Sequence, residues 1–124
     1  MSFCRKVSAA FTTTAGGAAT VYTDDVVTGR ILSVRYEYAD ADTGADITIT
    51  TEDTGQAVLT LTNAGTSTVQ KQPRQATHDV TGGAETYDAT EPVNDYIWAV
   101  NERLKVVVAQ GGNTKTGTLV FIVG

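Results

Sequence analysis

The chain has 124 residues and a mass of 13.0 kDa, which is enough for one domain and too little for two independent cores. Nine basic against 14 acidic residues give a net charge of −5, and the basic residues form no run, so we expect neither nucleic acid nor an anionic membrane surface as a partner. The single cysteine, Cys4, excludes an internal disulfide and a multi-cysteine zinc site.

Threonine and valine dominate the composition, with 22 and 15 residues, and they lie on short alternating segments that Gly, Asn and Asp interrupt. Turn signals at a spacing of roughly 8–12 residues are typical of a sandwich or barrel. We therefore predict an all-β fold: a single-domain antiparallel β-sandwich or barrel over residues 20–124, preceded by a flexible N-terminal arm over residues 1–19.

Residues 9–19 are small and flexible, which favours the arm. The alternative is an ordinary first strand that ends in a turn at Gly16-Gly17, and the sequence leaves both open.

Residues 19–23 predict a short strand and Asp24-Asp25 a turn. The clearest strand follows at residues 29–39, and its predicted inner face is Leu32, Val34, Tyr36 and Tyr38. Two further strands are predicted at residues 46–52, where Ile47 and Ile49 share a face, and at residues 56–63.

Residues 66–72 are typical of an edge strand, because Pro73 lacks the backbone donor that central pairing needs. Residues 73–95 alternate little and contain Gly82-Gly83 and Pro92, which indicates a long irregular excursion over the surface. Loops of this length often carry function.

Residues 96–100 hold the single Trp, and Asn101-Glu102 turns the chain into a strand at residues 103–110. Gln110-Gly111-Gly112-Asn113 predicts a hairpin that pairs this strand with residues 117–123. Both faces of the last strand are apolar, so we expect it to lie centrally in the sandwich or under another subunit.

No motif for catalysis, cofactor binding or metal binding is found, and we predict no enzyme activity and no cofactor. The acidic segment 40–46 fails the EF-hand pattern, because its fifth position is Gly44 and its twelfth is Thr51, and a turn explains its composition better than a looser calcium loop. His78 could act in hydrolysis with Asp79 or Glu85, but the chain offers no matching nucleophile.

The start of the chain has no apolar core of a signal peptide, and no apolar stretch reaches about 18 residues, so we expect synthesis in a cytoplasm and no membrane partner. The aromatic residues suit the core of the sandwich or a protein interface or, alternatively, a platform that stacks on glycans; they are Tyr22, Tyr36, Tyr38, Tyr87, Tyr96 and Trp98. The candidates for partner contact are Phe11, Tyr22, Arg74, His78, Tyr87, Tyr96 and Trp98.

Four segments together carry a resemblance to a known class of protein: residues 15–23 (AGGAATVYT), 29–36 (GRILSVRY), 73–79 (PRQATHD) and 101–118 (NERLKVVVAQGGNTKTGT). Over most of residues 15–124 the chain resembles the small β-rich virion proteins of tailed bacteriophages. The resemblance implies a capsid decoration or cement protein on the exterior of the virion, with the major capsid protein and copies of itself, as a homotrimer, as partners. A tail-tip or fibre module that binds host surface glycan or another tail protein is the alternative.

Overall fold

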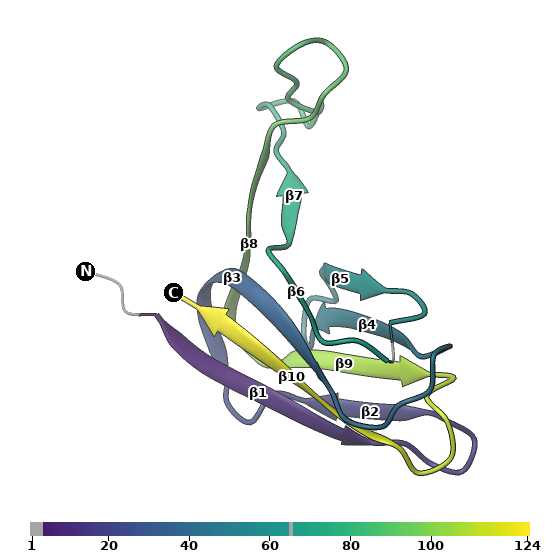
Figure 1. Cartoon of the computed structure of the whole chain (residues 1–124). Coiled ribbons are helices and arrows are strands. Elements are labelled where there is room, and N and C mark those ends of the chain that lie inside the picture. The colour runs from purple at the N-terminus through teal and green to yellow at the C-terminus, as the bar shows by residue number, and fades with distance from the viewer. Residues whose placement is uncertain (1–3, 65) are drawn as a thin grey trace.

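The computed structural model describes residues 4–64 and 66–124, and these residues form ten strands and no helix (Figure 1). The described residues thus contain no helix with the length and hydrophobicity needed to cross a membrane. The strands are β1 (Arg5–Thr12), β2 (Ala19–Tyr22), β3 (Val27–Tyr38), β4 (Asp46–Thr51), β5 (Ala57–Leu61), β6 (Val69–Lys71), β7 (Arg74–Ala76), β8 (Asn94–Glu102), β9 (Leu104–Ala109) and β10 (Thr116–Val123).

The strands form two antiparallel sheets, which confirms the predicted all-β sandwich. The first sheet has the order β1-β10-β3-β8-β7, with β6 paired to β3, and the second has the order β2-β9-β4-β5. Alternate residues of each sheet point into the core between them. On β10 these are Leu119, Phe121 and Val123, and on β4 they are Ile47 and Ile49, as the alternation predicts.

The long strand β3 contains a bulge that the sequence did not reveal. Ser33 pairs with Ile122 while Ile31 pairs with Val123, so Leu32 is an extra residue between two regular pairs. The bulge turns Ile31 into the core and leaves Leu32 half-buried at the surface. The predicted inner face is therefore correct for Val34 and Tyr36 and wrong for Leu32. It is also wrong for Tyr38, which is 43% exposed at the end of β3, beyond the edge of the core.

The hairpin predicted around Gly111-Gly112 is wrong, because β9 and β10 belong to different sheets. Both strands bury one apolar face, and a connection between the sheets lets both faces line one core. The crossing loop packs tightly on the turn after β1: Gly111 donates a backbone hydrogen bond to Gly17 at 2.9 Å, and a Cβ on Gly111 would lie 2.8 Å from Thr13 Cγ2. The glycines thus permit a close approach between loops rather than a two-residue turn.

The predicted N-terminal arm is also wrong from residue 5 onward, while residues 1–3 lie outside the described part of the chain. Strand β1 pairs with β10 along its whole length and contributes buried side chains, including Phe11, whose ring stacks on Tyr36 at 6.4 Å between centroids. The alternative interpretation, a first strand with a turn at Gly16-Gly17, is the one observed. Strand β1 therefore belongs to the same domain as residues 20–124.

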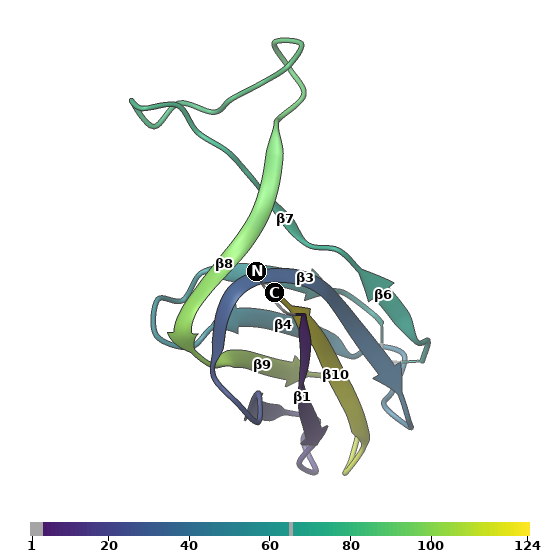
Figure 2. The ribbon, with the colours of Figure 1, turned by 90° about the vertical axis from the view of Figure 1, so that its left-hand side faces the viewer.

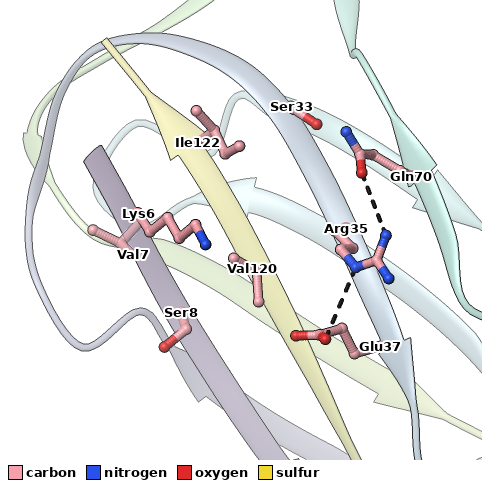
Figure 3. A pocket seen from close by; sticks show the side chains of 9 residues that line it. All are labelled: Lys6, Val7, Ser8, Ser33, Arg35, Glu37, Gln70, Val120 and Ile122. Carbon is pink, nitrogen blue, oxygen red and sulfur yellow. Dashed lines mark hydrogen bonds and ion pairs between the residues drawn. The ribbon is translucent and has the colours of Figure 1, made fainter. Parts of the chain in front are cut away.

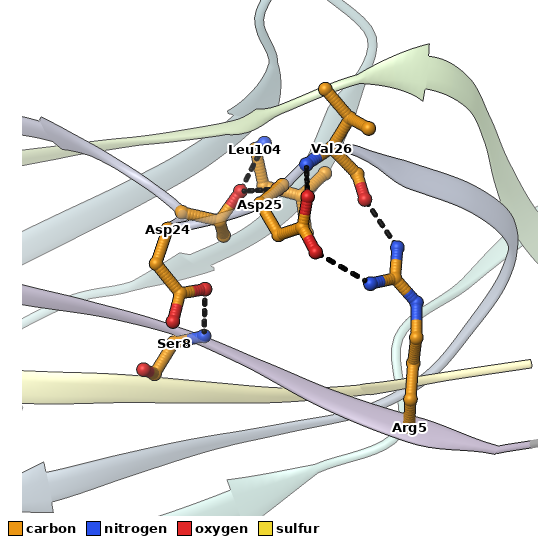
Figure 4. A network of polar contacts seen from close by, with 7 residues as sticks. Arg5, Ser8, Asp24, Asp25, Val26 and Leu104 are labelled. Carbon is orange, nitrogen blue, oxygen red and sulfur yellow. Dashed lines mark hydrogen bonds and ion pairs between the residues drawn. The ribbon is translucent and has the colours of Figure 1, made fainter.

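The outer edge of β1 is closed by the turn between β2 and β3 (Figure 4). Ser8 and Asp24 exchange two hydrogen bonds: the Ser8 amide donates to Asp24 Oδ1 at 3.2 Å, and the Asp24 amide donates to the Ser8 carbonyl at 2.9 Å. The Arg5 guanidinium pairs with Asp25 at 3.1 Å and donates to the Val26 carbonyl. These contacts occupy backbone groups that an open edge strand would offer to another chain.

Candidate interaction surface

The segment predicted as an irregular excursion forms a β-hairpin that projects from the sandwich (Figures 1 and 2). We define the hairpin as residues 74–96 and its tip as residues 77–93. Strand β7 pairs with the start of β8, and beyond this ladder the Thr77 amide donates a hydrogen bond to the Val93 carbonyl at 2.8 Å. Two isolated bridges, His78 with Ala84 and Thr86 with Pro92, close two smaller loops at the end of the hairpin. Residues 78–95 are all exposed, so the hairpin stands outside the hydrophobic core.

The base of the hairpin is fixed to the sandwich around Tyr96. The guanidinium of Arg74, on β7, lies 4.1 Å from the centre of the Tyr96 ring, and that of Arg30, on β3, lies 5.0 Å from it. Gln75 accepts a hydrogen bond from Gln56, next to β5, at 2.6 Å. Cation–π contacts of this kind contribute about 0.5–1 kcal/mol each at exposed sites. Arg74 and Tyr96, both predicted as partner contacts, thus contact one another and set the direction of the hairpin.

Two turns that aspartate side chains close make up much of the tip. Asp79 Oδ1 accepts hydrogen bonds from the Thr81 hydroxyl at 2.7 Å, the Thr81 amide at 2.9 Å and the Gly83 amide at 3.0 Å. Asp88 accepts in the same way from the Glu91 amide at 2.6 Å and from Thr90. These hydrogen bonds lower the pKa of both carboxyl groups, with the Thr81 hydroxyl as the main cause for Asp79 and the Glu91 amide for Asp88. Near neutral pH both carboxylates are therefore charged, and they hold the tip in shape.

The acidic charge of the chain is concentrated on the hairpin. Five of the 14 acidic residues and none of the nine basic residues lie in residues 77–95, so the rest of the chain carries nine of each sign. The carboxylates of Glu85 and Glu91 form no ion pair with any described residue. The tip also exposes three large apolar side chains: Val80, which is fully exposed, Tyr87, which is 71% exposed, and Val93, which is 39% exposed. A single exposed apolar side chain is ordinary, but several of them on one projecting, preorganised element make the tip a candidate for contact with another protein.

The structure places the remaining candidates apart. Phe11 is 2% exposed and packs in the core, so its prediction as a partner contact is wrong. Tyr22 lies on β2 with the Arg103 guanidinium 4.4 Å above its ring, and His78 is exposed in the tip. Trp98 is 54% exposed on β8, at the base of the hairpin. Six residues of extended chain, about 20 Å, separate Trp98 from Pro92, where the loop that carries Tyr87 closes, so these rings do not form one stacking platform.

Five exposed large apolar residues of the described chain are not among the predicted partner contacts: Val26, Tyr38, Val80, Val93 and Val100. Val80 interrupts an otherwise polar turn, and this departure from turn composition was a usable signal. Val100 lies two residues after Trp98 on the same face of β8, so the alternation of that strand could have identified it.

The aspartates of residues 40–46 serve different backbone groups. Asp40 Oδ1 accepts from the Thr116 amide at 2.6 Å, and Asp46 Oδ1 accepts from the Asn63 amide at 3.0 Å. Within residues 4–64 and 66–124, no group of three or more His, Cys, Asp or Glu side chains is arranged to hold a metal ion. A structural role in turns accounts for these carboxylates.

No protein family, no curated protein and no solved structure matches this chain.

Proposed function

We propose that this protein is a structural component of a virion, which decorates and stabilises an assembled capsid by binding the major capsid protein and copies of itself. The observation that carries this proposal is the projecting hairpin, whose tip exposes Val80 and Tyr87. The resemblance of residues 15–23, 29–36, 73–79 and 101–118 to small β-rich proteins of tailed bacteriophages supports the choice of particle.

The geometry suits a protein that binds only an assembled lattice. The sandwich provides a rigid base, because its core is complete without the tip: between Leu61 and Ile97 the only buried residue described is Pro73. The hairpin extends the reach of this base, and its contacts around Tyr96 hold it ready for binding. A protein that binds the assembled shell and not its free subunits stabilises the shell by mass action.

The test compares the intact protein with a variant in which an Asn-Gly turn replaces residues 77–93. This turn joins Ala76 to Asn94, which already form a pair in the hairpin ladder, and it removes no residue of the core. Purified protein is added to undecorated capsids, and binding is measured by co-sedimentation, stabilisation by resistance of the capsids to heat.

We expect the intact protein to bind and to raise the heat resistance, and the truncated variant to do neither. Equal thermal unfolding of the two purified proteins is the control that the sandwich remains folded. Absence of binding, equal binding by the truncated variant, or binding to tails instead of capsids would contradict the proposal.

Trp98 is the observation that favours the alternative, a tail-tip or fibre module that binds host glycan. Its exposed ring lies on the outer face of the first sheet, where a sugar could stack on it. A signal on a glycan array that Trp98→Ala removes and Tyr87→Ala retains would favour this function over decoration.

A further inference from the structure

The outer face of the first sheet contains a groove that is separate from the hairpin (Figure 3). The groove has a volume of about 420 Å³ and extends over β1, β10, β3 and β6. Val120 and Ile122 of β10 form its apolar floor, because the pairing register directs them away from the core. Lys6 of β1 and Arg35 of β3 lie on the same face beside this floor. The groove therefore combines apolar and cationic side chains on one face of a rigid sheet.

The polar groups of this groove have unused capacity to donate hydrogen bonds. Ser33, which lines it, is only 7% exposed, and its hydroxyl has no hydrogen-bond partner among the described residues. The Lys6 ammonium forms no ion pair within the described chain. Arg35 reaches Glu37 at 3.8 Å and Gln70 at 3.4 Å, and both distances are long. The Ser33 hydroxyl oxygen is itself inaccessible, so the groups that a ligand with acceptor oxygens can reach are the Lys6 ammonium and the Arg35 guanidinium.

The tip of the hairpin has the complementary chemistry. Its free carboxylates, Glu85 and Glu91, supply acceptor oxygens for Lys6 and Arg35, and no basic residue of the tip opposes them. Its exposed apolar side chains, Val80 and Tyr87, match the apolar floor of the groove. Glu37 also lines the groove, so the charged side chains Lys6, Arg35 and Glu37 give it a net charge of +1.

We propose that the hairpin tip of one copy of this chain binds in the groove over β10 of a second copy. The inference depends on that part of the proposed function in which copies associate, and it names the two surfaces that do so. Such contacts are head-to-tail, because each copy uses its tip on one neighbour and its groove on another. Interfaces of this type close into a ring when the rotation between copies permits.

The experiment uses the purified full chain without particles, so that its outcome is independent of capsid binding. The groove variant carries Lys6→Glu and Arg35→Glu, and the tip variant carries Glu85→Lys and Glu91→Lys. Lys71→Glu is the matched control, because this exposed lysine lies on β6 but does not line the groove. The mass of each protein is measured by light scattering and sedimentation velocity over a range of protein and salt concentrations.

We expect the wild-type chain and the Lys71→Glu control to form oligomers that dissociate as salt rises, and each charge-reversed variant to remain monomeric. An equimolar mixture of the groove and tip variants should associate again, because each reversed surface meets a complementary one. Thermal unfolding at the wild-type temperature would show that the variants are folded, and the tip variant changes exposed residues only.

A wild-type chain that stays monomeric at millimolar concentration would overturn this inference. So would a groove variant that associates as strongly as the wild type, or a mixture of the two variants that does not associate. If the groove variant loses capsid binding while its self-association is intact, a capsid protein occupies the groove instead, and the inference is wrong while the proposed function stands.

Discussion

Replacement of Phe11 by alanine tests whether the first strand is part of the core or an arm. The Phe11 ring stacks on Tyr36 and fills the space beside Gly117, where an added Cβ would lie 2.6 Å from Phe11 Cζ. Gly117 is also the direct pairing partner of Phe11 on β10, so no side chain from that position can fill the cavity that the substitution creates.

We expect Phe11→Ala to lower the free energy of unfolding by about 3–5 kcal/mol. With an unfolding entropy of about 2.1 cal/mol/K per residue, a chain of 124 residues has roughly 0.26 kcal/mol/K, so the melting temperature should fall by about 12–20 °C. Urea titration and calorimetry measure both quantities.

Tyr87→Ala is the matched control, because it removes an exposed aromatic ring from the tip and should change the free energy of unfolding by less than about 0.5 kcal/mol. A loss of less than about 1 kcal/mol for Phe11→Ala would refute the placement of β1 in the core and restore the arm.

Three further predictions concern packing, the base of the hairpin and pH. Gly117→Ala should cost about 1–3 kcal/mol by overpacking against Phe11, and the double variant with Phe11→Ala should cost less than the sum of the single ones, as urea titration would show. Tyr96→Ala should speed proteolytic cleavage in the tip, whereas Tyr87→Ala should not, because only Tyr96 contacts the guanidinium groups at the base. Burial of Glu102 opposes its charged form, but hydrogen bonds from the turn before β5 outweigh this effect and lower its pKa. The charged side chain therefore stabilises the fold at pH values above its ordinary pKa of 4.5, and this stabilisation is lost as the pH falls through the lower pKa of the folded state. Melting temperatures of Glu102→Gln and wild type should thus differ near neutral pH and converge in acid.

Additive costs for Gly117→Ala and Phe11→Ala would show that the two positions do not share one space. Equal cleavage of the Tyr96→Ala and wild-type tips would show that the base does not order the hairpin. A difference between Glu102→Gln and wild type that is unchanged by acid would exclude the lowered pKa as the cause.

The sequence predicted those features of the fold that depend on local alternation. Ile47 and Ile49 point inward as expected, since a regular strand has a period of two residues. It did not predict the exposure of Leu32, because a bulge shifts this period by one residue without a compositional signal. Nor did the glycines at 111 and 112 reveal that β9 and β10 lie in different sheets, since a tight turn and a close loop crossing require the same residue type.

The candidate site was predictable to a similar extent. The sequence predicted a long excursion over the surface after Pro73, and the candidate Tyr87 is exposed at its tip. The sequence offered Tyr96 as a candidate partner contact, whereas its role at the base depends on Arg30, which is 66 positions away in the chain and is brought close only by folding. The groove is likewise assembled from residues of β1, β3, β6 and β10, which are far apart in the chain, so no local sequence pattern marks it.

The central claim is that the projecting tip binds another protein chain, and a density map of the intact particle tests it most directly. We expect residues 77–93 to be ordered against an adjacent subunit, with Val80 and Tyr87 buried in the contact. A tip that extends into solvent without a neighbour, or a particle that lacks this chain, would contradict the account.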